Sequence, residues 1–172
     1  MIATTAVAPG LARSAGGQTM NEQPNCPTCG QTIKEYWHAL TPGLVSALVK
    51  FRKAVVEKGQ NSVHLLKDMK DPAYELSRHE WNNFTKLRFH GLAVKDKDGP
   101  AGYWLLTKRG ASFLKNELAV PRKVKTFNNA VQDHGEQLVT IKDVLGTVPI
   151  FETIDDIEYE ILSPEDAQTR LI

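Results

Sequence analysis

The sequence predicts an α+β fold, and three observations support this prediction. Helix-capping signals precede several segments in which apolar residues recur at helical spacing. Two short strands rich in aromatic and apolar residues flank a turn-forming stretch at residues 96–100. A Cys-x-x-Cys pair, Cys26 and Cys29, stands ahead of these elements. Together they indicate a small N-terminal knuckle followed by a helical domain with one β-hairpin.

The first long helix is expected to begin after Thr41 and Pro42, because a hydroxyl N-cap followed by proline at the first helical position is a strong start signal. It is expected to end at Gly59, which suits a C-cap. A short strand at residues 62–66 follows, and Asp71 repeats the cap-plus-proline signal for a second, short helix.

A capping box at residues 77–80 is expected to open the next helix, over residues 78–90. Residues 92–95 and 103–106 then read as the two strands of a hairpin, and a further capped helix is expected at residues 108–116. A helix-turn-helix followed by a flanking β-hairpin is the plan of a winged helix. The order of elements therefore predicts a winged helix-turn-helix-like domain over residues 41–118.

The residues themselves also resemble that class. Phe84-Thr-Lys-Leu87, Gly91-Leu92 and Gly102-Tyr-Trp-Leu-Leu-Thr-Lys-Arg-Gly110 with Phe113-Leu114 look like the end of a recognition helix, the wing and the LT-x-x-G-x-x-FL helix start of many bacterial winged-helix regulators. With Cys-Pro-Thr-Cys-Gly ahead of it, the pattern over residues 25–130 is similar to uncharacterised proteins of phages and bacterial mobile elements. The resemblance implies a fold and says little about biochemical role.

Four parts of the chain are expected. Residues 1–24, rich in Ala, Gly, Thr and Pro, read as a disordered leader. Residues 25–40 form the Cys-x-x-Cys knuckle, and residues 41–118 form the winged-helix-like domain. Residues 119–172 are expected to hold a basic strand and then a β-containing acidic C-terminal extension, because the span 150–172 carries seven acidic residues against one arginine. The net charge of +1 hides this asymmetry.

The helix expected at residues 78–90 has an apolar and a polar face. Trp81, Phe84 and Leu87 are expected to pack inward. The opposite face holds amide and basic side chains that can read base edges, namely His79, Asn82, Asn83, Lys86 and His90. An ordinary solvated face is the alternative, although two adjacent asparagines are unusual in a helix interior. Phe89 falls near the polar side, where it would cover the wing, pack against another chain or stack on a base.

A basic segment follows the last helix of the domain. Arg122, Lys123 and Lys125 are candidate phosphate contacts, since residues 102–132 carry six basic residues against one acidic residue. The alternation of charged and apolar residues also fits an exposed edge strand that lysines protect from aggregation. Both interpretations remain open at this point.

The Cys26–Cys29 pair is half of a zinc site, because the tight turn directs two thiolates to one point. No other cysteine exists, so the remaining ligands are expected from histidine, water or a second chain. The nearest histidines are His38 and His64. A knuckle that has lost its metal and a redox dithiol are the alternatives, and the redox alternative lacks the βαβ context that such motifs usually have.

Enzymatic function is not expected, since the sequence holds no phosphate loop, dinucleotide fingerprint, Gly-x-Ser-x-Gly elbow or His-Glu-x-x-His motif. No apolar run approaches the roughly 18 residues that span a bilayer, so no membrane association is expected. No secretory signal is recognisable, and two cysteines make no disulfide framework. A cytoplasmic location is therefore expected.

Two functions from different classes follow. The first is a regulator of phage or mobile-element type that binds DNA, most naturally double-stranded DNA, and works as a homodimer because one winged helix buries little surface. The second is a protein-interaction module that docks on a host or phage protein, partly through its acidic tail. A continuous positive surface across Lys86, Lys123 and Lys125 would favour DNA, whereas a neutral or apolar surface around Phe89 would favour a protein partner.

Overall fold

The fold is described from a computed structural model, which describes residues 25–151. Two segments lie outside the described residues: the expected leader, 1–24, and most of the expected acidic extension, 152–172. The chain divides into two compact units, Met1–Ile33 and Lys34–Ile172. Within residues 25–151 there are four α-helices and three small antiparallel sheets, which confirms the α+β class.

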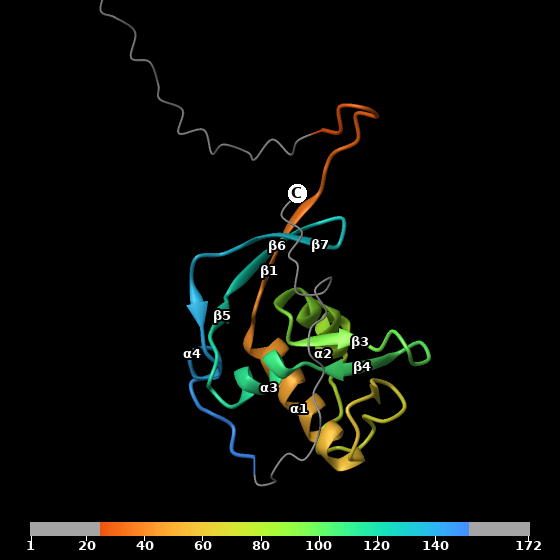
Figure 1. Cartoon of the computed structure of the whole chain (residues 1–172), viewed down its shortest axis with the longest axis vertical. Helices are drawn as coiled ribbons and strands as arrows, with labels where there is room; N and C mark the ends of the chain where they lie inside the picture. Colours follow the sequence, from red (N-terminus) through yellow and green to blue (C-terminus); the bar gives the residue numbers. More distant parts are fainter. Residues whose placement is uncertain (1–24, 152–172) are drawn as a thin grey trace, which may run out of the picture. The chain divides into compact units, whose positions relative to one another are not determined.

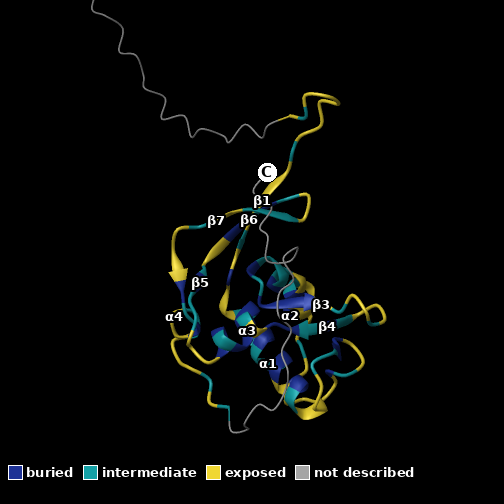
Figure 2. Cartoon of the chain, viewed as in Figure 1, coloured by how far each residue is buried: buried dark blue, intermediate teal, exposed yellow. Residues whose placement is uncertain are grey.

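Helix α1, Pro42–Lys58, forms where the sequence predicts it (Figure 1). The Thr41 side chain accepts a hydrogen bond from the Leu44 amide at 3.3 Å, and Gly59 closes the helix in the left-handed conformation with φ of 65°. Its apolar face supplies much of the core of the Lys34–Ile172 unit, as the buried colouring of α1 in Figure 2 shows. Phe51 lies fully buried on this face and packs edge-on against Phe84, with ring centroids 5.2 Å apart.

The segment expected as one helix over residues 78–90 has two parts. Helix α2, Arg78–Asn83, begins with the expected capping box between Ser77 and Glu80. The chain then tightens into the 3₁₀ helix η1, Phe84–His90, which ends at Gly91 with φ of 69°. A 3₁₀ helix has about three residues per turn, so residues three apart stand in line along one side. The buried residues of η1 follow this spacing: Phe84, Leu87 and His90.

A three-stranded antiparallel sheet lies next to these helices, with strand order β2-β4-β3. Its strands are β2, Val63–His64, β3, Ala93–Lys95, and β4, Tyr103–Leu106. The expected hairpin is therefore confirmed. The short helix expected after Asp71 was a wrong prediction: the Tyr74 and Glu75 amides donate to the Asp71 carbonyl in a single turn, and the capping box at Ser77 starts the next helix before this turn can extend.

Helix α3, Lys108–Leu114, follows the hairpin directly. The Thr107 hydroxyl accepts a hydrogen bond from the Gly110 amide at 2.9 Å, which confirms the predicted cap. Gly110 lies so close to the Leu92 carbonyl that any side chain at this position would collide with it. The glycine of the LT-x-x-G-x-x-FL pattern therefore allows α3 to pack against the residue that leads into β3.

A second antiparallel sheet has the order β1-β6-β7. It contains β1, Glu35–Ala39, β6, Lys123–Phe127, and β7, Ala130–His134. Residues 35–39, included in the knuckle by the sequence analysis, thus form a strand of the larger unit. Because β6 pairs on both sides, the interpretation of the basic segment as an edge strand is wrong.

A two-stranded sheet and a last helix complete the described chain. Strands β5, Val120–Pro121, and β8, Leu138–Val139, pair with each other, and helix α4, Ile141–Leu145, follows with a Thr140 cap. Ile141 is fully buried and joins the core cluster that α1 supplies. In the part of the chain that the structure describes, no helix is long and apolar enough to cross a membrane.

Candidate nucleic-acid interface

Helix α2 is anchored to α1 through Glu80, which is 7% exposed. Its carboxylate accepts hydrogen bonds from the Lys50 ammonium at 2.7 Å and from the Ser46 hydroxyl at 2.9 Å. Burial raises the pKa of Glu80, but the hydrogen bonds from Lys50, Ser77 and Ser46 outweigh burial and hold the pKa below its ordinary value. The one carboxylate of α2 is therefore turned inward and neutralised by α1.

The polar face expected on this segment is present over α2 and the first turn of η1. His79 and Asn82 are exposed, and Asn83 and Lys86 are half-buried. The Asn83 amide nitrogen donates to the His79 carbonyl at 2.8 Å, and the Lys86 ammonium donates to the Asn83 amide oxygen at 2.6 Å. Both groups of the Asn83 side-chain amide are thus hydrogen bonded within the α2–η1 segment. The Asn82 amide makes no hydrogen bond to any residue between 25 and 151, which leaves its donor and acceptor available.

His90 does not belong to this polar face, and its placement there was a wrong prediction. It is 3% exposed, because the three-residue spacing of η1 aligns it with Phe84 and Leu87. Neither ring nitrogen has a hydrogen-bond partner in the described chain. Burial lowers the pKa of His90 to about 4, and the Pro121 carbonyl, which favours the charged form, offsets only part of this effect.

Trp81 also departs from its expected place, since it is 43% exposed instead of packed inward. Phe89 lies on the other side of the segment and stacks on His38 of β1, with ring centroids 4.7 Å apart. The same histidine ring is hydrogen bonded through Nε2 to the Thr126 hydroxyl at 2.8 Å. Phe89 therefore packs against its own chain, which is none of the three roles considered for it from the sequence.

The basic segment lies on the sheet face that points away from η1. Val124 and Thr126 of β6 are buried on the side where His38 meets Phe89, so alternation along the strand turns Lys123 and Lys125 to the opposite side. Arg122 and Lys123 are exposed, whereas Lys125 forms an ion pair with Glu35 of β1. Lys86 therefore does not share one surface with Lys123 and Lys125.

The α2–η1–β3 stretch has a strong charge bias that the sequence analysis missed. Its carboxylate, Glu80, is buried, whereas its basic side chains are exposed or half-buried. These basic residues are Arg78, Lys86, Arg88 and Lys95. A count of charged residues over 78–95 would have revealed the excess of basic residues. The burial of Glu80 could not be found in this way, because it depends on tertiary contacts with α1.

The Cys-x-x-Cys pair lies in the other unit and forms a tight turn. Gly30 donates its amide to the Cys26 carbonyl at 2.8 Å, and Cys26 donates to the Gln31 carbonyl at 2.8 Å. Hydrogen bonds from the Cys29 and Thr28 amides lower the pKa of the Cys26 thiol below its ordinary value. Amides directed at a sulfur stabilise a thiolate, so this turn fits the two-cysteine half of a zinc site.

The two candidate histidine ligands have other partners. His38 is held by Thr126 and Phe89, as above. His64 accepts hydrogen bonds at Nδ1 from the Leu66 and Lys67 amides, at 3.1 and 3.2 Å. Among the described residues there is no group of three or more His, Cys, Asp or Glu side chains that could hold a metal. The third and fourth zinc ligands therefore remain a prediction.

The predicted contact residues thus fall into separate places. His79, Asn82, Asn83 and Lys86 lie on the α2–η1 segment, Lys123 lies on the far face of the β1-β6-β7 sheet with Arg122 in the bend before it, and His90 is buried. Comparison with known proteins adds no assignment: no family model, curated protein or solved structure matches this chain.

Proposed function

We propose that the protein is a regulator of phage or mobile-element type that binds double-stranded DNA through α2, η1 and the β3–β4 hairpin. The order of elements supports the proposal. Helix α1, strand β2, a turn, the α2–η1 segment and a hairpin follow one another, and the strands are ordered β2-β4-β3. Figure 1 shows α2 and the β3–β4 hairpin close to α1. A helix and a neighbouring hairpin are also the elements that a winged helix presents to DNA, which supports the proposal.

The charge bias of the α2–η1–β3 surface is the observation that carries the proposal. Phosphates attract basic side chains whatever the base sequence, and an exposed carboxylate between them would oppose this attraction. Here Glu80 accepts hydrogen bonds from Ser46 and Lys50 inside the protein, and it leaves Arg78, Lys86 and Arg88 without an acidic neighbour on their own segment.

Base recognition is assigned to Asn82 first. An asparagine amide can pair with the N6 and N7 edge of adenine, and Asn82 is exposed with its amide unengaged by described residues. His79 is a second exposed candidate. Asn83 contributes indirectly, since its amide fixes Lys86. Lys123 is a secondary phosphate candidate, because it lies on the far face of the β1-β6-β7 sheet, and Arg122, exposed in the bend before β6, is another.

The variant Asn82→Ala tests this assignment together with Lys86→Gln. Loss of a bidentate base contact is expected to cost about 1–3 kcal/mol at a preferred site and little at other sequences. Lys86→Gln should weaken binding to all duplexes alike. Fluorescence anisotropy with a preferred duplex, selected from a random library, and with a scrambled duplex separates the two effects. Lys142→Gln, on the exposed side of α4, is the matched control.

Dimerisation and zinc binding are part of the same proposal. One domain of this size buries little DNA surface, so a two-fold dimer on a palindromic site is expected. Cys26 and Cys29 are proposed to hold one zinc ion, with the remaining ligands from histidine, water or the same turn of a second chain. In the last case the metal would also join the two chains.

A protein-interaction module is the second candidate, and β1 is the observation that favours it. Tyr36 and Trp37 are 53% and 51% exposed on this strand, which is an edge of its sheet. An edge strand with exposed aromatic side chains suits the addition of a strand from a partner protein. The contact expected through the acidic extension lies outside the described residues. Binding of a protein partner that Trp37→Ser abolishes, without any DNA binding, would favour this candidate.

A further inference from the structure

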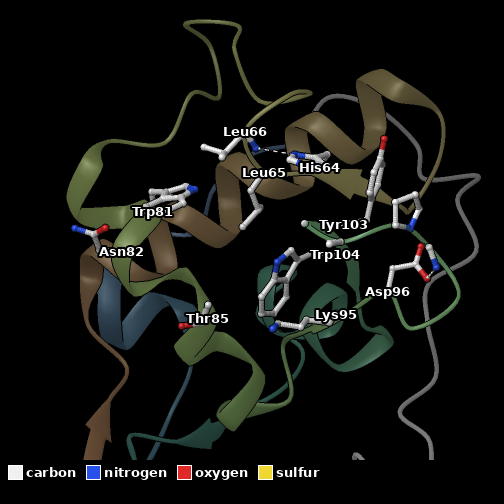
Figure 3. A pocket seen from close by; sticks show the side chains of 14 residues that line it. His64, Leu65, Leu66, Trp81, Asn82, Thr85, Lys95, Asp96, Tyr103 and Trp104 are labelled. Atoms are coloured by element: carbon white, nitrogen blue, oxygen red, sulfur yellow. Dashed lines mark hydrogen bonds between the residues drawn. The ribbon is translucent and has the colours of Figure 1, made fainter.

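A cavity of about 510 Å³ opens between the α2–η1 segment and the hairpin. Its lining comes from the β2 turn, from α2 and η1, and from both strands and the tip of the hairpin. Ligand sites for small molecules usually have volumes of roughly 300–1,000 Å³ and mostly apolar walls with a few polar groups. Figure 3 shows Trp81 on the α2 side of the cavity and Trp104 on the hairpin side.

One wall of the cavity is rigid and aromatic. Trp104 is buried and packs edge-on against Phe84, with ring centroids 5.2 Å apart. Tyr103 packs edge-on against His64 at 5.0 Å. The opposite wall is more exposed, since Trp81 and Leu66 have 43% and 56% of their surface accessible. Trp81 and Leu66 therefore leave apolar surface accessible beside the cavity. A planar ligand bound in the cavity would cover this surface.

The rim near His64 is built by backbone contacts. The His64 Nδ1 atom accepts hydrogen bonds from two amides, so the neutral ring carries its proton on Nε2. The ring lies directly against Gly102, whose φ of +91° favours glycine and where any side chain would collide with His64. The His64 ring is therefore held in one orientation by the loop that the hairpin provides.

Two charged side chains line the cavity, Asp96 and Lys95. The Asp96 carboxylate stays ionised and is held by hydrogen bonds from the Ser62 hydroxyl and from the Asp98 and Gly99 amides of its own turn. Lys95 has no acidic partner among the described residues, and its ammonium lies 5.9 Å from the centre of the Trp104 ring. The Asn82 amide and the Thr85 hydroxyl, also in the lining, make no hydrogen bond within residues 25–151.

We propose that this cavity binds a small planar aromatic carboxylate. The aromatic ring would lie between Trp81 and Trp104, and the carboxylate would accept hydrogen bonds from Lys95 and from Asn82 or Thr85. A cationic ligand would be repelled by Lys95, and an uncharged ring would leave this ammonium unpaired. The Asp96 carboxylate requires the acidic end of the ligand to point away from the hairpin tip. The proposal is independent of DNA binding, although Asn82 and Lys95 belong to both surfaces.

The test compares 2-naphthoate with 2-naphthamide, which share one ring system and differ in the charge and hydrogen-bonding groups of their single substituent, by ligand-observed NMR titration of the full chain. The carboxylate is expected to bind saturably and about 1.4-fold to fivefold more tightly than the amide, the range for one exposed ion pair. Lys95→Gln should remove this preference while leaving the affinity for the amide unchanged. Trp81→Ala should weaken both compounds. Lys108→Gln, an exposed change outside the cavity, is the control.

Three results would overturn the proposal: no saturable binding of either compound, equal affinity for both in the wild-type protein, or an unchanged preference in Lys95→Gln. Lys95 is exposed, so its substitution is not expected to unfold the protein, and an unchanged melting temperature verifies this. If Trp81→Ala melts early, Thr85→Val serves in its place and should weaken the carboxylate more than the amide.

Discussion

At the scale of single residues, His90 is the position where burial and chemistry conflict most. A histidine that is buried without a hydrogen-bond partner must stay neutral, and its pKa of about 4 expresses this requirement. His38, His134 and Arg109 add positive charge nearby, which opposes protonation further. Such a residue makes the folded state sensitive to acid.

The sign of this sensitivity follows from the two protonation states. Because the folded pKa lies below the ordinary value of 6.5, the unfolded chain binds more protons between these values. Stability is therefore complete above pH of about 6.5 and falls towards pH of about 4, by roughly 2–3 kcal/mol from this group. His90→Leu should flatten the pH dependence of urea unfolding in this window. The exposed variant His79→Leu should keep the wild-type slope, and an identical slope in His90→Leu would contradict the account.

Glu80 is the residue on which the position of α2 depends. Glu80→Ala removes the partner of Lys50 and half of the capping box, so it is expected to lower the free energy of unfolding by about 2–4 kcal/mol. Glu80→Gln should cost less, since an amide oxygen can still accept from Ser46 or Ser77. Thermal denaturation monitored by circular dichroism measures both, with the exposed Glu75→Ala as control. Equal losses for Glu75→Ala and Glu80→Ala would show that Glu80 does not anchor the helix.

At the scale of elements, the Cys-x-x-Cys turn is expected to hold zinc. The amides that lower the pKa of the Cys26 thiol favour the thiolate that a metal requires. Elemental analysis of protein purified without chelator should give about one zinc per chain, or about one per two chains if two turns share the ion. Cys29→Ser should remove the metal. Metal-free protein whose two thiols both react freely would leave the segment as a turn without a metal role.

The sequence predicted those elements whose signals are local. Thr41, Ser77 and Thr107 cap their helices as expected, because each cap depends on residues only three positions away. The hairpin followed equally from its aromatic strands and its turn residues. The change from α2 to η1 was not predictable in this way. The change depends on how Phe84 and Leu87 fit the core. A period of 3.6 residues per turn places His90 on the polar side, whereas the three-residue period of η1 places it with the buried Phe84 and Leu87.

The second sheet was missed for a related reason. Strand β1 pairs with a strand far along the sequence, with His38 opposite Val124 of β6, and no local pattern near β1 indicates this partner. This pairing turns Lys123 away from Lys86 and commits Lys125 to Glu35. His79 and Asn82 are exposed as expected, but the predicted site combines residues from two surfaces that the fold keeps apart.

At the scale of the whole molecule, the α2–η1–β3 stretch carries four basic side chains that are exposed or half-buried and one carboxylate that is buried. Glu80 is withdrawn into the protein, Asn82 and His79 are exposed, and the hairpin adds Lys95 beside a hollow. A surface of this kind predicts strongly salt-dependent association with a polyanion.

The most direct test is the affinity of the full chain for duplex DNA as a function of salt concentration. The protein is expected to bind duplex DNA at low salt, and the logarithm of its association constant should fall linearly with the logarithm of the salt concentration. Arg78→Gln and Lys86→Gln should each lower the slope by about 1, because each removes one phosphate contact. Lys142→Gln should leave the slope unchanged. Absence of binding even at low salt, or the same slope in Arg78→Gln and Lys86→Gln as in the wild-type protein, would contradict the proposed DNA surface.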